Sequence, residues 1–105
     1  ISVYQILMNA RGALPPAKAV ATSLNISERT LHRKLADRDT SFRRALDTVR
    51  LRRARELLDG TSQDIQTISD VLGFAEVASF SRFFRRVAGV SPSIYRRNSK
   101  DVFMT

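Results

Sequence analysis

The sequence predicts an all-α fold in which two helix-turn-helix subdomains are joined by a long central helix. Apolar residues recur at helical spacing throughout, and no stretch alternates between apolar and polar residues as a half-buried strand would. The 4 Gly and 3 Pro stand where helices are expected to end or begin. One pattern of helix, tight turn and second helix also occurs twice. Together these observations indicate about seven helices in the 105-residue chain.

Three short helices are expected in the first part of the chain. They lie at about residues 2–11, 16–24 and 28–36. Gly12 closes the first helix, and the fixed φ of Pro16 suits the first position of the second. Asn25 is the turn residue, because Asn tolerates the left-handed conformation better than most residues. Ser27 can cap the third helix by accepting from a backbone N–H.

A long helix and three shorter ones follow. They lie at about residues 42–58, 65–72, 76–87 and 92–97, and the tail beyond has no clear pattern. Ser41 caps the long helix, which has a broad apolar stripe. Asp64 caps the next helix, and Gly73 breaks it. Ser91 and Pro92 open the last helix. The predicted organisation is a first helix-turn-helix subdomain at 1–40, a linker helix at 41–58, a second subdomain at 59–98 and a tail at 99–105.

The helix-turn-helix pattern occurs at residues 20–35 and again at 68–84, with one residue inserted in the second copy. The matching positions are Leu24 with Leu72, Asn25 with Gly73, Ile26 with Phe74, Leu31 with Phe80, Arg33 with Arg82 and Leu35 with Phe84. The turn in each copy needs a permissive backbone. Two copies in register, each with an arginine opposite its apolar stripe, are a stronger signal than one helical hairpin.

The second helix of each copy is the candidate for contact with DNA bases, and we call it the reading helix. With Leu31 and Leu35 at the buried centre, Arg29 and Arg33 point outward one turn apart, with His32 beside them. A helix laid in a major groove presents such residues to base edges. The corresponding ridge of the second copy holds Ala78, Ser81, Arg82 and Arg85, with Val77 near the helix start.

Simpler roles compete with base contact at these positions. For the two outward arginines of the first copy, the alternative is a solvated helix face. For His32, a surface role or a phosphate contact competes evenly.

The long helix sets the expected distance between the reading helices. At about 1.5 Å per residue, a helix of roughly 17 residues spans about 25 Å, and adding helix widths gives about 34 Å, one turn of B-DNA. Two reading helices could then enter successive major grooves from one side of the duplex, either by bending the DNA or by flexing the helix. One chain would thereby cover two half-sites.

Composition restricts the function classes. Lys and Arg number 18 against 10 Asp and Glu, and the net charge of +8 favours a polyanionic partner without choosing nucleic acid over an acidic membrane. Cys is absent and His occurs once, which argues against disulfides, thiol nucleophiles and metal sites. No apolar run approaches the roughly 20 residues that span a bilayer, so a soluble protein is expected. No Gly-rich phosphate loop or pair of carboxylates suggests a catalytic cleft. We therefore expect no enzyme activity, no cofactor and no metal.

A basic set without acidic residues runs from Arg82 to Lys100, and it suggests contact with phosphate. Each neutralised phosphate steepens the salt dependence of binding by about 0.9 in a log–log plot. The candidate phosphate contacts in the whole chain are Ser27, Thr30, Arg85, Arg86, Ser91, Arg96 and Arg97. Helix capping alone would explain both Ser27 and Ser91.

Arg50 and four phenylalanines lie outside these sets, and the sequence predicts where their side chains lie. Arg50 lies near the middle of the apolar stripe, so we expect it to be structural and partly buried. Phe74, Phe80 and Phe84 are expected in the core, because they recur at helical spacing. Phe83 is expected in the core as well, but it lies off the buried centre, so partial exposure and contact with a neighbouring domain, a second protomer or RNA polymerase is the alternative.

The stretches LNISERTLHRKL, RRARELL, GF at Gly73 and Phe74, FSRFFRR and VSPSIYRR together resemble the AraC/XylS family of bacterial transcription regulators. The resemblance covers about Pro16 to Arg97 and rests on the order and spacing of all these pieces. It implies promoter binding with activation of transcription, RNA polymerase as a partner, and a missing N-terminal effector or dimerisation domain. The family's base-reading positions fall on Arg29, His32 and Arg33 in the first unit, and on Val77, Ala78, Ser81 and Arg82 in the second.

Two positions depart from the family pattern. Asp39 stands where many relatives have Gly, and Ser79 where many have Tyr, which leaves the turn after the first reading helix and the packing of the second unit open.

The expected function is sequence-specific binding of double-stranded promoter DNA in the major groove. The domain would be the output domain of a bacterial transcription activator, located in the cytoplasm at the nucleoid. The main alternative is a helical interaction module that binds a protein partner or an acidic membrane through its basic face.

Overall fold

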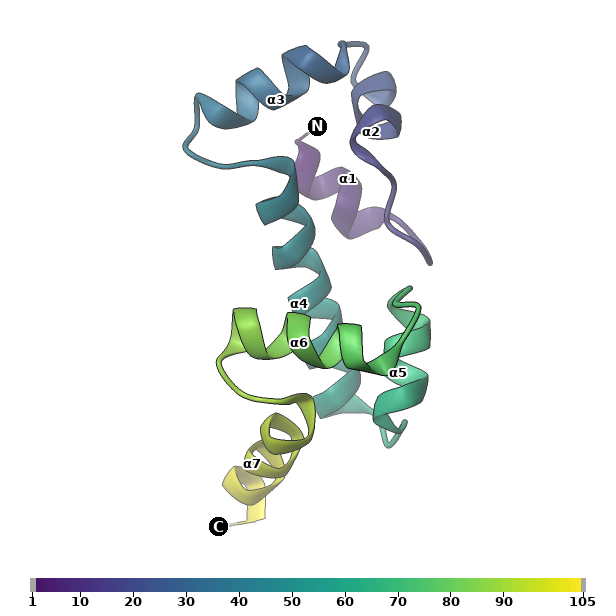
Figure 1. Cartoon of the computed structure of the whole chain (residues 1–105), viewed down its shortest axis with the longest axis vertical. Helices are drawn as coiled ribbons and strands as arrows, with labels where there is room; N and C mark the ends of the chain where they lie inside the picture. Colours follow the sequence, from purple (N-terminus) through teal and green to yellow (C-terminus); the bar gives the residue numbers. More distant parts are fainter. Residues whose placement is uncertain (1, 105) are drawn as a thin grey trace. The chain divides into compact units, whose positions relative to one another are not determined.

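The structure is a computed structural model that describes the backbone of residues 2–104 and the side chains of residues 2–99. These residues form seven α-helices and no strand, which confirms the predicted fold class (Figure 1). The helices are α1 (Val3–Asn9), α2 (Ala17–Ser23), α3 (Glu28–Ala36), α4 (Phe42–Gly60), α5 (Ile65–Val71), α6 (Val77–Ala88) and α7 (Pro92–Met104). The chain divides into two compact units, a first unit that ends at Val49 and a second unit that begins at Arg50. Residues of α4 therefore belong to both units.

The four predicted side-chain caps are all present. Each side-chain oxygen accepts a hydrogen bond from the backbone N–H three residues later, at 3.0 Å for Ser27, 3.2 Å for Ser41, 2.7 Å for Asp64 and 3.2 Å for Ser91. Such bonds satisfy N–H groups that the first turn of a helix leaves without an intrahelical partner. They account for the starts of α3, α4, α5 and α7.

Several helix boundaries differ from the prediction, and α1 ends at Asn9, before the Gly12 that was expected to close it. Ser2 is not the first residue of α1 but its N-cap, in a capping box with Gln5. Pro16 is likewise the N-cap of α2, with an extended backbone (φ −72°, ψ 166°). The prediction that the last helix ends near Arg97 is wrong, because α7 continues to Met104. No Gly or Pro follows Pro92 in the sequence, so nothing in the chain interrupts the helix there.

The turns that precede α3 and α6 have the same backbone hydrogen bonds. A left-handed residue stands at the same place in each turn, Asn25 with φ 58° and Gly73 with φ 86°. Its N–H donates to a carbonyl three residues earlier, and the next N–H donates to a carbonyl five residues earlier. The pairs are Asn25 with Thr22 at 3.1 Å, Ile26 with Ala21 at 3.1 Å, Gly73 with Asp70 at 3.0 Å and Phe74 with Ser69 at 3.1 Å. Both turns are therefore Schellman motifs, which satisfy the last carbonyls of α2 and α5.

Asp39, one of the two departures from the family pattern, also has a left-handed backbone. Its φ is 58°, its N–H donates to Ala36 at 3.0 Å, and the N–H of Thr40 donates to Leu35 at 3.1 Å. The end of α3 thus repeats the hydrogen bonds of the two turns. Asp is among the few residues other than Gly that enter this conformation, so the turn forms without the glycine.

Each unit has its own apolar core. The buried residues of the first unit are Leu7, Val20, Ala21, Leu31, Phe42 and Val49. Those of the second unit are Ala54, Leu58, Ile68, Phe80, Phe83 and Phe84. Leu35 and Ile26 pack against the first core, and Phe74 packs against the second. The inward faces predicted for the two reading helices are confirmed.

The suggested exposure of Phe83 is wrong, because only 7% of this residue is accessible. Its ring centroid lies 5.5 Å from that of Phe74, which follows the turn before α6. The guanidinium of Arg86 lies over the Phe83 ring, 5.8 Å from its centroid. Phe74 and Arg86 thus cover Phe83, a position that the helical pattern alone places at the edge of the core.

We expect Gly73→Ala to lower the free energy of unfolding by about 1 to 2 kcal/mol. A Cβ at Gly73 would meet no atom within 4 Å, so the cost comes from the left-handed backbone and not from a clash. Gly73→Asn should recover most of the loss, since Asn25 occupies the matching turn. Urea unfolding measures both. The control is Gly60→Ala in the last turn of α4, which also has open space and should not lower stability; equal results for the two alanine variants would contradict the account.

The cap of α5 should make stability depend on pH. Hydrogen bonds from Thr67, first from its side chain and then from its N–H, hold the pKa of Asp64 below its ordinary value of 3.8, with a smaller contribution from the charge of Arg96. A lowered folded-state pKa gives stability that is present above the unfolded-state pKa and is lost as pH falls through the folded-state pKa.

Asp64→Asn keeps an oxygen for the cap but cannot titrate. Between about pH 5 and about pH 2, its free energy of unfolding should therefore fall less than that of the wild type. Denaturant unfolding at a series of pH values tests this, and parallel profiles for the two proteins would count against it.

Candidate nucleic-acid interface

The first unit presents its three predicted base-reading residues on the exposed face of α3. Arg29, His32 and Arg33 are all exposed, whereas Leu31 between them is only 2% accessible. Within the described part of the chain, neither guanidinium has a hydrogen-bond or ion-pair partner. His32 Nε2 lies 3.6 Å from Glu28 Oε1, and both side chains are about half exposed. The outer face of α3 therefore offers two unengaged guanidinium groups one turn apart.

The outer face of α6 is less polar. Ala78 and Arg82 are exposed, while Val77 and Ser81 are partly buried. The guanidinium Nη2 of Arg82 donates to Ser79 Oγ at 3.4 Å. Ser79 is the second departure from the family pattern, and its hydroxyl contacts the one long cation predicted to read bases from this helix.

Three of the predicted phosphate contacts are polar residues at helix starts. Ser27 Oγ accepts from the N–H of Thr30 at 3.0 Å and donates to Thr30 Oγ1 at 2.9 Å. Ser91 Oγ accepts from the N–H of Ile94 at 3.2 Å. Capping thus accounts for the presence of both serines, which is the alternative to phosphate contact that the sequence also allows.

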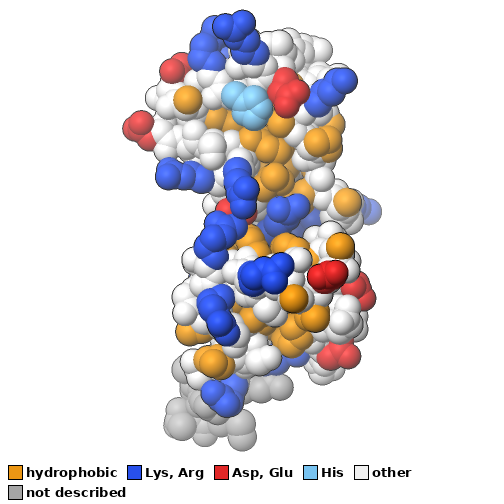
Figure 2. Space-filling model, in the orientation of Figure 1, with side chains coloured by type: hydrophobic (Ala, Val, Ile, Leu, Met, Phe, Trp, Pro, Cys, Tyr) orange, Lys and Arg blue, Asp and Glu red, His pale blue; other side chains and the backbone are white. Residues whose placement is uncertain are grey.

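Basic side chains are spread over the face of each unit that Figure 2 shows, with apolar side chains between them. Arg85, Arg86 and Arg97, which are predicted phosphate contacts, are exposed. Arg86 also covers Phe83, so part of its surface packs against the second core. The three arginines have the exposure that a phosphate contact requires.

Arg96 is placed differently from the other predicted phosphate contacts. Its guanidinium donates to the carbonyls of Leu58 at 3.1 Å, Leu57 at 3.4 Å, Thr61 at 3.4 Å and Gln63. The side chain is partly buried at the end of α4. These bonds occupy Nε, Nη1 and Nη2, so the predicted phosphate role conflicts with the contacts that Arg96 makes inside the second unit.

Arg50 has the structural setting predicted for it. The residue is partly buried, and its guanidinium lies 5.6 Å from the centroid of the Phe74 ring. Its Nε is buried and has no hydrogen-bond partner in the described structure. A cation over an aromatic face is attracted by the ring quadrupole, so Phe74 compensates part of the cost of burying this charge.

Two residues that form hydrogen bonds within the second unit, Ser69 and Tyr95, are not predicted from the sequence. Ser69 on α5 is fully buried, and its hydroxyl donates to the carbonyl of Glu76, the N-cap of α6, at 3.5 Å. The signal for it was the repeat, since Ser69 stands where the first unit has the buried Ala21. Tyr95 on α7 donates to Asp59 Oδ2 at 2.8 Å. Burial, followed by the hydrogen bond to Asp59, raises the pKa of Tyr95, so the phenol stays protonated and donates.

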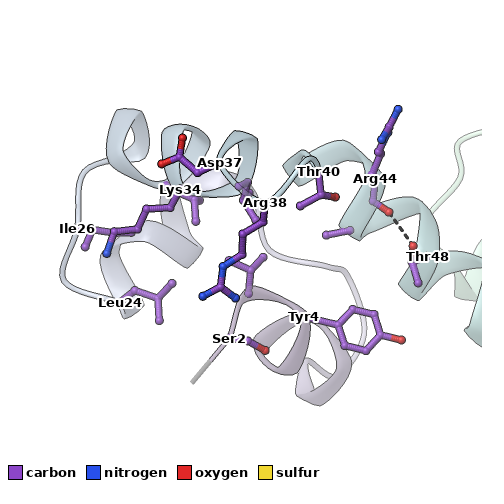
Figure 3. A pocket seen from close by; sticks show the side chains of 14 residues that line it. Ser2, Tyr4, Leu24, Ile26, Lys34, Asp37, Arg38, Thr40, Arg44 and Thr48 are labelled. Carbon is purple, nitrogen blue, oxygen red and sulfur yellow. Dashed lines mark hydrogen bonds between the residues drawn. The ribbon is translucent and has the colours of Figure 1, made fainter.

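A groove of about 730 Å³ lies in the first unit, next to α1, α3 and the start of α4 (Figure 3). Its lining includes apolar residues such as Leu24 and Ile26, with Lys34 and Arg38 from α3 and the following turn. The three predicted base-reading residues of α3 do not line it. The outward arginines therefore lie outside the groove.

Two other kinds of site find no support in the described residues. No three His, Asp or Glu side chains gather there in a way that could hold a metal ion. None of the helices formed by residues 2–104 has the length and apolar character needed to cross a membrane.

A family model and curated relatives point to the same protein family. A helix-turn-helix domain model matches residues 20–98. The transcriptional regulator VqsM of Pseudomonas aeruginosa is 39% identical over 84 residues, which cover 80% of this chain and 26% of VqsM. The chain thus spans about a quarter of the length of such curated relatives.

Solved structures share the fold. The transcriptional regulator CdpR of Pseudomonas aeruginosa is similar over 79% of this chain and 26% of its own, with a TM-score of 0.76 and 41% identity. A regulator from Chromobacterium violaceum, described as containing an AraC-type DNA-binding domain, is similar over 91% of this chain and 83% of its own, with a TM-score of 0.78 and 25% identity. The chain therefore belongs to the AraC-type helix-turn-helix family of DNA-binding transcription regulators.

Proposed function

We propose that this domain binds double-stranded promoter DNA sequence-specifically in the major groove, with α3 and α6 as the reading helices. The observation that supports this most directly is the pair of unengaged arginines on the outer face of α3, Arg29 and Arg33. An arginine fork that donates to guanine O6 and N7 contributes about 1 to 3 kcal/mol of discrimination between bases. An exposed ion pair on the same face would contribute less than about 1 kcal/mol, so base contact is the stronger use of these side chains.

The two reading helices are proposed to contribute unequally. On α3, Arg29, His32 and Arg33 would contact base edges. On α6, Val77 and Ala78 would contact a thymine methyl, while Ser81 and Arg82 supply the polar contacts. One chain would then cover two half-sites about one helical turn apart, in successive major grooves.

Phosphate contacts are proposed to add affinity without choosing a sequence. The exposed Arg85, Arg86 and Arg97 are the charged candidates. At the helix starts, Ser27, Thr30 and Ser91 stand beside backbone N–H groups, and such groups bind phosphate oxygens well.

The parent protein is proposed to be a bacterial activator that works in the cytoplasm with RNA polymerase. NphR of Rhodococcus, 36% identical over 78 residues, and CfaD of Escherichia coli, 33% identical over 73 residues, are both named transcriptional activators. Since this chain corresponds to 23% and 28% of those proteins, we also propose that an effector or dimerisation domain precedes it in the parent.

Selection of bound fragments from random DNA tests the proposal. It should recover two short motifs about one helical turn apart, and the recovered duplex should bind at least about 1000-fold more tightly than its scrambled counterpart at physiological salt. Equal affinity for both duplexes would instead favour a basic interaction module that binds a protein partner or an acidic membrane.

The inequality of the reading helices gives a second test. Arg33→Ala should relax the base preference of one half-site by about 5- to 100-fold, whereas Arg82→Ala should relax the other half-site less, because Arg82 is also engaged by Ser79. Repeating the selection with each variant measures both effects. Equal losses in the two half-sites would refute the inequality.

A further inference from the structure

We propose that Arg96, together with Tyr95, positions the second reading helix and does not contact phosphate. This inference rests on the proposed function, because it assigns a role in base discrimination to two residues that do not touch DNA. It also replaces the phosphate contact that the sequence predicted for Arg96.

Arg96 forms hydrogen bonds to the end of α4. Its guanidinium donates to Leu57 and Leu58 in the last turn of that helix, at 3.4 Å and 3.1 Å. The last carbonyls of a helix form the negative end of the helix dipole, so a cation there is stabilising. The Leu57 carbonyl also accepts from the N–H of Thr61 at 3.2 Å, so Arg96 is an additional donor to it. The partners lie 39 and 38 residues earlier in the chain, so the contact ties α7 to the other end of the second unit.

Arg96 is also connected to α5. The same guanidinium donates to Thr61 and Gln63, in the segment that leads from α4 to Asp64. Asp64 is the N-cap of α5 and accepts from the N–H of Thr67 at 2.7 Å. One planar group thus fixes both the end of α4 and the approach to α5. A lysine, with a single ammonium on a flexible stem, cannot make the same set of bonds.

Contacts reach α6 by two routes. From α5, Ile68 packs in the core with Phe80, and the hydroxyl of Ser69 donates to the carbonyl of Glu76 at 3.5 Å. From α7, the ring of Tyr95 meets the buried ring of Phe84 edge-on, with centroids 5.4 Å apart.

Tyr95 itself is held at both ends. Its hydroxyl donates to Asp59 at 2.8 Å, and the guanidinium of Arg55 lies 6.0 Å from its ring centroid. Adjacent residues of α7 therefore contact the end of α4, the approach to α5 and the buried face of α6. Base reading depends on placing a helix accurately in the groove. We call the contacts of Arg96 and Tyr95 the brace of the second unit. Loosening this brace should therefore reduce discrimination between bases in the half-site that α6 reads.

The neighbouring arginines of α7 provide a matched pair of variants, Arg96→Gln and Arg97→Gln. Arg97 is exposed, and its guanidinium has no partner among the described residues. If Arg97 contacts phosphate, Arg97→Gln should reduce the slope of log affinity against log salt by about 0.9 for every duplex and leave the melting temperature unchanged. For Arg96→Gln we expect an unchanged slope, a melting temperature lower by at least about 5 °C and an about tenfold loss of discrimination confined to the α6 half-site.

The measurements use the selected duplex, duplexes mutated in one half-site at a time, and a temperature well below melting. Arg96→Lys keeps the charge and should still lose discrimination in the α6 half-site, whereas a phosphate contact would tolerate lysine. Tyr95→Phe removes only the hydroxyl bonded to Asp59. It should lower both the melting temperature and the discrimination in the α6 half-site, by less than Arg96→Gln does. This variant replaces Arg96→Gln in the test if Arg96→Gln does not fold.

Either of two results from the binding and melting measurements would overturn the proposal. A salt slope reduced by about 0.9 in Arg96→Gln with an unchanged melting temperature would make Arg96 a phosphate contact. A lower melting temperature with full discrimination in both half-sites would make it a structural residue without a positioning role.

A wild-type protein without sequence preference would instead defeat the proposed function. Amide hydrogen exchange at residues 61–64 would still decide whether Arg96 holds this segment. Faster exchange in Arg96→Gln than in Arg97→Gln supports the brace, and equal exchange overturns it.

Discussion

One backbone position in each unit, Asn25 in the first and Gly73 in the second, must have a left-handed φ for the helix-turn-helix to close. That residue ends one helix, satisfies its last carbonyls and places the next residue, Ile26 or Phe74, against the core. The reading helix that follows then buries its apolar face, so its arginines point outward. The exposure of Arg33 thus depends on the turn that precedes it.

The arginines of this chain divide by what their guanidinium groups contact. Arg29 and Arg33 have no protein partner in the described structure, and their charge is available to a ligand. Arg50 lies over Phe74, and Arg96 donates to four carbonyls of the second unit. A net charge of +8 therefore overstates the charge that faces a partner, because part of it stabilises the fold.

Features that depend on neighbouring residues could be predicted from the sequence. The caps at Ser27 and Asp64 need only a side-chain oxygen and an N–H three residues later, and the turn at Asn25 needs only a residue that tolerates a left-handed backbone. The role of Arg96 could not be predicted, because its partners lie 33 to 39 residues away and depend on how α7 packs. The alternative of an exposed Phe83 fails for the same reason, since Phe74 from outside α6 covers it.

Methylation protection at guanine N7 tests most directly whether two helices with outward arginines read DNA from the major groove, because this atom lies in that groove. With the selected duplex, the account predicts two protected clusters whose centres are about 10 base pairs apart. Unprotected guanines, or protection confined to adenine N3 in the minor groove, would contradict it.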